Sequence, residues 1–317
     1  MFWTGELIAR SAPIRRRVSI ERSPMAERAV AAYIGLAIGD ALGATVEFMT
    51  PGEIRAQYGL HDEIRGGGWL RLKAGQVTDD TTMALALGEA ILAAGHVDAP
   101  AAAAAFDAWM RAKPVDIGNT VRRNLITYRQ SGNPVAPPSE HDAGNGAVMR
   151  LLPAALATYG QTAEQIRAAS QAQAHVTHHN TLSDAACETL TFAVHDLLAG
   201  KSSRDIEGQR VAPLIADFPV FAYDRKRRDN PSGYVVDTLQ AVFQAFFATE
   251  SFEDCLLDVV NRGGDADTTG AIAGMLAGAR YGMAGIPKRW LRALDDFTRV
   301  RCEKQAEALL QLACPTA

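Results

Sequence analysis

Two short segments of this 317-residue chain combine carboxylates with hydroxyl side chains. Residues 78–82 are Thr-Asp-Asp-Thr-Thr and residues 263–269 are Gly-Gly-Asp-Ala-Asp-Thr-Thr, and an apolar pattern of helical period follows each of them. One Asp at a helix start is explained by capping, because its side chain accepts hydrogen bonds from free N–H groups. Adjacent carboxylates repel each other, however, and buried carboxylates need a compensating cation.

The donor atoms of these two segments indicate the kind of cation. They are oxygens alone, which favours hard ions such as Mg²⁺, Mn²⁺ or Ca²⁺ over Zn²⁺. The spacing does not match an EF-hand loop. From the residues alone, a two-metal hydrolytic site and plain helix capping remain alternatives.

Several other residues could take part in catalysis or binding, but each of them, taken alone, is also explained by an ordinary structural role. Asp116 precedes a predicted helix and is suited to capping it. The Gly-Asn-Gly sequence at residues 144–146 also precedes a helix, where free N–H groups form an anion cradle, although turns use the same residues. Three histidines lie within residues 175–179, and His175 is equally well explained as a core residue. Arg150 is suited to either a phosphate or a helix carboxylate.

Helices are expected to position these residues. Apolar residues recur at intervals of three and four, and no clean alternation of apolar and polar residues occurs. We therefore predict an all-α fold in one compact domain. The expected helices span residues 25–44, 80–94, 99–112, 117–130, 147–158, 163–172, 181–198, 234–248, 252–261, 267–282, 287–294 and 297–312.

Glycines form a second pattern on two of these helices. They recur every four residues at Gly35, Gly39 and Gly43, and again at Gly270, Gly274, Gly278 and Gly282. In a membrane such faces pair helices, whereas in a soluble chain they let two helices approach closely in the interior. We favour close interior packing, because each glycine costs ~1 kcal/mol relative to alanine and its repetition needs a structural reason.

The overall composition is that of an ordinary globular protein. There are 32 Lys and Arg against 36 Asp and Glu, so the chain lacks the basic excess that nucleic acid binding requires. The four cysteines form no CxxC pair, which argues against a zinc knuckle and fits a reducing cytoplasm. No apolar run reaches the ~18 residues of a membrane span. We therefore expect a cytoplasmic protein with no transmembrane segment and no nucleic acid partner.

The first 24 residues differ from the rest. Arg15–Arg17 would suit a twin-arginine export signal, but Asp40 and Glu47 interrupt the apolar region and no cleavage site is evident. We expect residues 1–24 to be a flexible extension, or to come from a start upstream of Met25, and residues 25–317 to form the domain.

Ordered motifs along the chain resemble the ADP-ribosylglycohydrolase family. They are Gly-Asp-Ala-Leu-Gly at 39–43 with Glu47, Val-Thr-Asp-Asp-Thr at 77–81, Gly-Asn-Gly-Ala-Val-Met-Arg at 144–150 and Gly-Gly-Asp-Ala-Asp-Thr-Thr-Gly at 263–270. Segments 66–70, 114–118 and 271–278 are similar to family members that act on dinitrogenase reductase. The similarity runs from about Ala29 to beyond Leu294. One departure is Thr82, where relatives commonly carry Glu or Gln.

The resemblance implies an all-α domain with a binuclear centre of Mn²⁺ or Mg²⁺. The implied ligands are Thr78, Asp79, Asp80, Asp265, Asp267 and Thr268. The implied reaction is hydrolysis of the N-glycosidic bond between ADP-ribose and arginine. Asp116 would protonate the leaving guanidine or stabilise a ring-opened sugar, and Glu47 would place or deprotonate the attacking water. Which of the two is the principal acid or base stays open.

The resemblance also implies contacts to the substrate. They are Asn119, Glu140, Gly144, Asn145, Gly146, Met149, His178 and Tyr223. The loop at 144–146 would hold the diphosphate and ribose, His178 the ribose, and Tyr223 the adenine.

The expected substrate is an ADP-ribosylated protein, with the nitrogenase iron protein as its expected identity. A PII-type signalling partner, peripheral membrane association and a monomeric state are further expectations from the resemblance. Three alternatives stay open: another ADP-ribosylated protein or small molecule as substrate, a non-catalytic ADP-ribose binder, and an unrelated two-metal phosphoesterase. The basic run at residues 225–228 is either a solvated loop or a surface for an acidic protein substrate.

Overall fold

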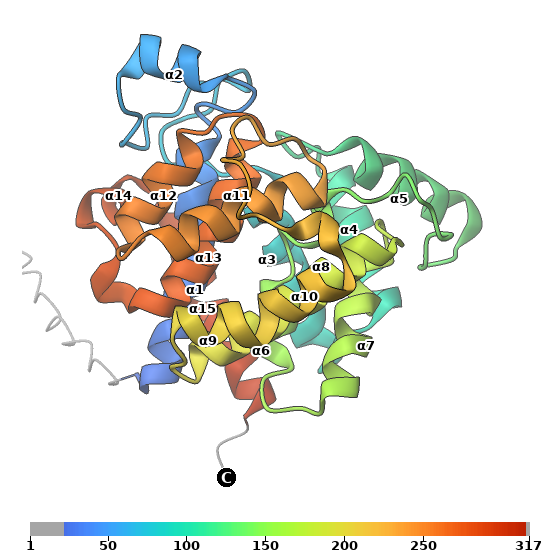
Figure 1. Ribbon diagram of the computed structural model, residues 1–317. Coiled ribbons are helices and arrows are strands. Elements are labelled where there is room, and N and C mark those ends of the chain that lie inside the picture. The colour runs from blue at the N-terminus through green and yellow to red at the C-terminus, as the bar shows by residue number, and fades with distance from the viewer. Residues whose placement is uncertain (1–21, 315–317) are drawn as a thin grey trace, which may run out of the picture.

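Helices provide the regular structure of the computed structural model, which describes residues 22–314 (Figure 1). Within these residues there is no strand, and β-pairing is limited to two isolated bridges, Gly67–Leu72 and Gly144–Tyr234. The predicted all-α class is confirmed. Residues 1–21, which make up most of the predicted extension, lie outside the described residues. None of the helices in the described part is both long and apolar enough to span a membrane.

Most helices follow one another closely along the chain, and the longer connections are residues 59–78, 132–144 and 222–234. The α-helices are α1 (Pro24–Gly43), α2 (Pro51–Tyr58), α3 (Asp79–Ala94), α4 (Ala99–Arg111), α5 (Asn119–Ser131), α6 (Leu152–Ala157), α7 (Ala163–Ala174), α8 (Thr181–Leu198), α9 (Ser203–Ile206), α10 (Ala212–Asp217), α11 (Val235–Ala248), α12 (Phe252–Val260), α13 (Ala266–Gly285), α14 (Lys288–Ala293) and α15 (Asp296–Ala313). Short helical turns of other types are η1 (Asn145–Ala147), η2 (Glu207–Val211) and η3 (Pro219–Phe221).

Three regions differ from the predicted helices. α2 was not predicted, because Ile54 is its only buried residue and an exposed helix carries no apolar period. The run from α9 to α10 was also not predicted, since the π-helical turn η2 interrupts it and Pro213 restarts it. The helix predicted over 147–158 is instead η1 followed by the short α6, which begins at Leu152 with Pro153 in its first turn.

The glycine faces of α1 and α13 pack directly against each other in the interior (Figure 1). A Cβ added at Gly39 would lie 1.9 Å from the carbonyl oxygen of Gly270, and one added at Gly35 would lie 2.1 Å from that of Gly274. No side chain fits between the two backbones, which confirms the interpretation of these glycines as sites of close packing. The register is antiparallel, so the C-terminal end of α1 meets the N-terminal end of α13.

Candidate active site

A cavity of about 410 Å³ lies where the N-terminal ends of α3, α5 and α13 converge. Twelve of the sixteen residues expected to form the site line it: Glu47, Asp79, Asp116, Asn119, Gly144, Asn145, Gly146, Met149, His178, Asp265, Asp267 and Thr268. Thr78 and Asp80 lie buried directly behind this lining, where the Thr78 hydroxyl is 3.1 Å from Asp80 Oδ2 and 3.4 Å from Asp267 Oδ2. Segments far apart in sequence therefore meet at one cavity.

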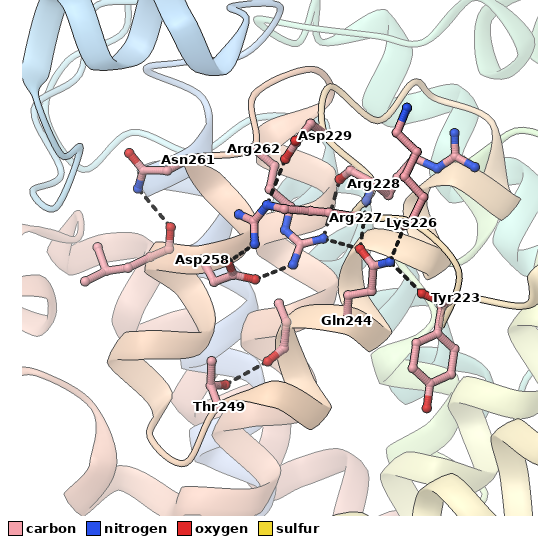
Figure 2. Close-up of polar contacts among 12 residues, drawn as sticks. Tyr223, Lys226, Arg227, Arg228, Asp229, Gln244, Thr249, Asp258, Asn261 and Arg262 are labelled. Atoms are coloured by element: carbon pink, nitrogen blue, oxygen red, sulfur yellow. Dashed lines mark hydrogen bonds and ion pairs between the residues drawn. The ribbon is translucent and has the colours of Figure 1, made fainter.

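Glu140 and Tyr223 are not brought to this cavity. Glu140 is exposed on the connection between α5 and η1. The Tyr223 hydroxyl donates to Glu207 at 2.5 Å, and the Tyr223 ring packs against Phe243 and Phe247. Figure 2 shows its backbone oxygen bonded to Gln244 while its ring points away from the neighbouring arginines. Tyr223 thus belongs to a separate surface groove.

Residues 225–227 of the basic run 225–228 line the same groove. Arg227 pairs with Asp229 at 2.9 Å and with Asp258 at 2.7 Å (Figure 2). The Arg228 side chain is also tied down, by the side-chain oxygen of Gln240 at 2.8 Å. Two of the four cations therefore have partners within the protein.

Asp40 anchors the start of α3 from within α1. This fully buried carboxylate accepts hydrogen bonds from the backbone and hydroxyl groups of both Thr78 and Thr81, including the Thr78 N–H at 2.9 Å and the Thr81 hydroxyl at 2.5 Å. Burial raises the pKa of Asp40 to about 6, although these hydrogen bonds oppose the shift. The sequence motif that contains Asp40 gave it no role. The sequence feature that could have indicated a role for Asp40 is that it is a single carboxylate within an otherwise apolar helix with regularly spaced glycines.

Carboxylates from distant parts of the chain converge on one side of the cavity. Glu47, Asp265 and Asp267 each present an oxygen, and these oxygens all lie within 4.8 Å of one another. Burial, together with repulsion from Glu47 and Asp80, raises the pKa of Asp267 well above its usual value. Burial and the nearby Asp116 raise the pKa of Asp79 to about 8. Such a cluster is unfavourable when all its members are ionised, unless a cation neutralises it.

Asp80 provides a specific test of whether the residues fit a cation. Its Oδ1 atom is fully buried and has no hydrogen-bond partner. Burial and the charges of Asp40 and Asp79 raise the pKa of Asp80 well above its usual value. A buried carboxylate oxygen without a donor is costly, whereas a divalent cation would satisfy it. The donor set, oxygen alone, fits a hard divalent ion.

Glu47 and Asp116 face the cavity from two different loops. The indole N–H of Trp69 donates to Glu47 Oε2 at 2.7 Å. Burial, then repulsion from Asp265 and other carboxylates, raises the pKa of Glu47 to about 8 against the opposing effect of the indole. Asp116 Oδ1 accepts from the backbone N–H of Ile117 at 2.8 Å. Both carboxylates are held in place, and Trp69 is a contact that sequence reasoning missed.

The glycines of the 144–146 segment make room for His178. A Cβ at Gly144 would lie 3.0 Å from His178 Nε2, and one at Gly146 would lie 2.7 Å from His178 Cε1. Asn145 crosses to the carboxylate cluster, where its side-chain amide donates to Asp265 Oδ2 at 2.6 Å. The segment therefore joins the acidic side of the cavity to the histidine side.

A chain of hydrogen bonds fixes the orientation of His178. Arg150 Nη2 donates to the Thr177 hydroxyl at 2.8 Å, and this hydroxyl lies 2.8 Å from His178 Nδ1. Because a guanidinium only donates, the hydroxyl accepts from Arg150, and its own hydrogen is free to be directed to Nδ1. In the tautomer that uses this hydrogen, Nε2 carries the ring proton, on the side of the glycines. Burial lowers the pKa of His178 well below its usual value, so the ring is neutral.

Arg150 itself contacts neither a phosphate site nor a helix carboxylate, the two alternatives left open by its sequence. It is fully buried, donates to Gln173 Oε1 at 3.1 Å, and lies over the Phe106 ring at 4.2 Å. Burial lowers its pKa to about 9. Among the described residues it is a core arginine that supports the histidine.

This chain is similar to known proteins over most of its length. The family model for ADP-ribosylglycohydrolase matches residues 21–316. An ADP-ribosyl-(dinitrogen reductase) glycohydrolase of Rhodospirillum rubrum is 50% identical over 289 residues, which cover 90% of this chain and 97% of the relative. The ADP-ribosylarginine hydrolase Tri1 of Serratia proteamaculans is 35% identical over 307 residues, covering 93% of this chain and 82% of the relative.

A solved structure gives the same result for the fold. It is described as an ADP-ribosylglycohydrolase-related protein complex, and it superposes with a TM-score of 0.82 at 34% sequence identity. The alignment covers 92% of this chain and 99% of that one. This chain therefore belongs to the ADP-ribosylglycohydrolase family of enzymes.

Proposed function

We propose that this chain hydrolyses the N-glycosidic bond between ADP-ribose and an arginine side chain of a modified protein. The observation that carries the proposal is the convergence of carboxylates from α3, α13 and the Glu47 loop on one cavity, with the buried Oδ1 of Asp80 left without a donor. The named activities of the two relatives described above support the choice of bond.

The acidic cluster is suited to two divalent cations, Mn²⁺ or Mg²⁺. Their ligands would be Thr78, Asp79, Asp80, Asp265, Asp267 and Thr268. Bound there, the two cations would supply the positive charge that acidifies a water molecule and orients the ribose hydroxyls. Without such charge, burial and mutual repulsion raise the pKa values of Asp79, Asp80 and Asp267, so these carboxylates favour their protonated forms.

Asp116 and Glu47 are suited to the proton transfers. As the glycosidic bond lengthens, the anomeric carbon gains oxocarbenium character and the guanidine departs. Guanidine is a poor leaving group unless it is protonated, and Asp116, which lines the cavity, would protonate it. Glu47, beside Asp265 and Asp267, would deprotonate or position the attacking water.

The opposite side of the cavity is suited to the rest of ADP-ribose. The segment at residues 144–146, whose glycines leave room beside His178, would hold the diphosphate. The N–H of Asn145 is already used, because it donates to the carbonyl oxygen of Gly233 at 3.0 Å. His178, with Nδ1 beside the Thr177 hydroxyl, would contact a ribose hydroxyl through Nε2. Asn119 and Met149 line the same cavity and complete its wall.

The modified protein is proposed to be dinitrogenase reductase, the nitrogenase iron protein, because the relative from Rhodospirillum rubrum is named for that substrate. Control by a PII-type protein, peripheral membrane association and the monomeric state stay predictions from the family resemblance. A different ADP-ribosylated protein is the second candidate, since the Tri1 relative is named only for ADP-ribosylarginine.

The deciding experiment compares linkages. The protein is incubated with ADP-ribosylated dinitrogenase reductase, an ADP-ribosyl-arginine peptide and an ADP-ribosyl-serine peptide, each with Mn²⁺ or with EDTA. We expect ADP-ribose release from both arginine-linked substrates with Mn²⁺ only, and no release by the Asp116→Asn variant. Asp296→Asn, a change at an exposed position on α15, is the matched control and should retain the parental rate. Cleavage of the serine-linked peptide alone would contradict the proposed activity.

A further inference from the structure

Two aromatic side chains stand exposed at the edge of the active-site cavity. Phe48 is 65% exposed and Trp69 is 54% exposed, and both line the cavity. Their ring centroids are 5.4 Å apart with the ring planes tilted by 46°. Apolar rings of this size normally leave water on folding, so an exposed pair at a cavity mouth indicates a binding surface.

The backbone around this pair is held in unusual conformations. Phe48 has a φ of +62°, which is rare for a bulky residue. Its N–H donates to the carbonyl oxygen of Gly264 at 2.7 Å, next to Asp265. Gly68 also has a positive φ, and a Cβ there would lie 2.5 Å from the carbonyl oxygen of Ala44. Surrounding contacts therefore hold both rings at this edge, and strain of this kind is concentrated at functional sites.

The pair lies at the reacting end of the cavity. Trp69 is hydrogen-bonded to Glu47, whose carboxylate is within 4.8 Å of the oxygens of Asp265 and Asp267. Asp116 lines the same cavity. The rings thus adjoin the carboxylates rather than the histidine side, and a cation between them would meet aromatic faces and negative charge together.

We propose that Phe48 and Trp69 form the subsite for the alkyl-guanidinium group of the modified arginine. This inference rests on the proposed function, because it assigns the part of the substrate that leaves. Aromatic faces attract a guanidinium through their quadrupole and stack on its plane. A neutral serine side chain gains neither interaction, so the subsite favours arginine-linked over serine-linked substrates.

Substitutions at Phe48 test the subsite without touching the hydrogen bond from Trp69 to Glu47. Phe48→Leu keeps an apolar side chain but removes the aromatic face, and Phe48→Tyr keeps the face. For Phe48→Leu we expect the KM for an ADP-ribosyl-arginine peptide to rise roughly 3- to 10-fold, which is the size of a partly exposed cation–π contact. The Kd for free ADP-ribose, measured by calorimetry, should stay at the parental value.

Two control variants show whether the effect belongs to the aromatic face at the cavity mouth. Phe48→Tyr should retain the parental KM, and so should Phe297→Leu, a change at another exposed phenylalanine that does not line the cavity. A parental KM in Phe48→Leu would overturn the inference. An equal weakening of ADP-ribose binding would also overturn it, since the rings would then contact adenine or ribose. If the parent protein releases no ADP-ribose from arginine, the proposed function fails and the subsite with it, whereas failure at Phe48 alone leaves the function standing.

Discussion

Asp80 is the residue whose surroundings point most directly to a bound cation. It is buried among other carboxylates, and one of its oxygens has no donor. The aspartate pairs themselves could be predicted from the sequence, because two adjacent carboxylates exceed what a helix cap needs. Asp40 and Trp69 could not be assigned, since their roles depend on contacts with Thr78 and Glu47 that only the folded chain creates.

Replacing Asp80 by Asn should have opposite effects with and without metal. In EDTA the variant should be more stable than the parent by about 1–2 kcal/mol at pH 8, because Asn is neutral and, unlike Asp80, needs neither a buried charge nor the uptake of a proton on folding. With Mn²⁺ the parent should be the more stable protein, and the variant should lose at least ~100-fold in turnover. Urea unfolding in both buffers measures this, with Asp296→Asn as the control. A variant that is less stable than the parent in EDTA would contradict the idea that the buried carboxylates repel one another.

The hydroxyl of Thr177 should control the ring proton of His178. Thr177→Val removes the donor to Nδ1, so we expect His178 to lose its single tautomer in ¹⁵N NMR spectra and the Kd for ADP-ribose to rise about 10-fold. Thr177→Ser keeps the hydroxyl and should restore both readouts. Identical ¹⁵N shifts in the valine variant and the parent would contradict the proposed series of hydrogen bonds from Arg150 through Thr177 to His178.

At the scale of elements, the contact between α1 and α13 brings the site together. The glycine period could be read from the sequence, and it correctly indicated close interior packing. What the sequence could not provide was the partner and direction of each face, because a four-residue period says nothing about which helix lies opposite. Two helical regions could not be predicted, because their sequences show no apolar period. They are the exposed helix α2 and the interrupted run from α9 to α10.

An alanine at Gly39 should separate these two helices. Its Cβ would lie 1.9 Å from the carbonyl oxygen of Gly270, so backbone must move. We expect a loss of about 3 kcal/mol or more in the free energy of unfolding, together with weaker Mn²⁺ binding because Asp40 lies beside the contact. Gly208→Ala is the matched control: no atom from elsewhere in the fold lies within 4 Å of its added Cβ, and the change should be neutral or slightly stabilising. Equal stabilities of the two variants would contradict the close packing of the two backbones.

At the scale of the whole molecule, folding concentrates negative charge at one cavity. The chain carries a formal net charge of only −4, yet Asp79, Asp80, Asp265 and Asp267 meet there with Glu47. The composition therefore looks unremarkable, because an average over the chain conceals where charges gather. Only the folded arrangement shows that they raise one another's pKa values.

This arrangement predicts how stability depends on pH. Folding raises the pKa of Asp79 from 3.8 to about 8 and that of Glu47 from 4.5 to about 8. The folded state therefore binds these protons more tightly than the unfolded state, so the stabilisation is fully present below about pH 4 and is lost as pH rises toward 8. Calorimetry in EDTA should show the melting temperature falling through this window. Mn²⁺ should raise it more at pH 8 than at pH 6, and a smaller metal effect at pH 8 would contradict the prediction.

The central claim is that carboxylates from the starts of α3 and α13 hold the divalent cations that hydrolysis requires. Its most direct test is a titration of EDTA-treated protein with Mn²⁺, in which bound Mn²⁺ is followed by electron paramagnetic resonance and ADP-ribose release from an ADP-ribosyl-arginine peptide is followed in parallel. We predict that activity is absent at the start and reaches its plateau as the second Mn²⁺ per chain binds. Full activity in EDTA, or activity that does not follow Mn²⁺ binding, would contradict the claim.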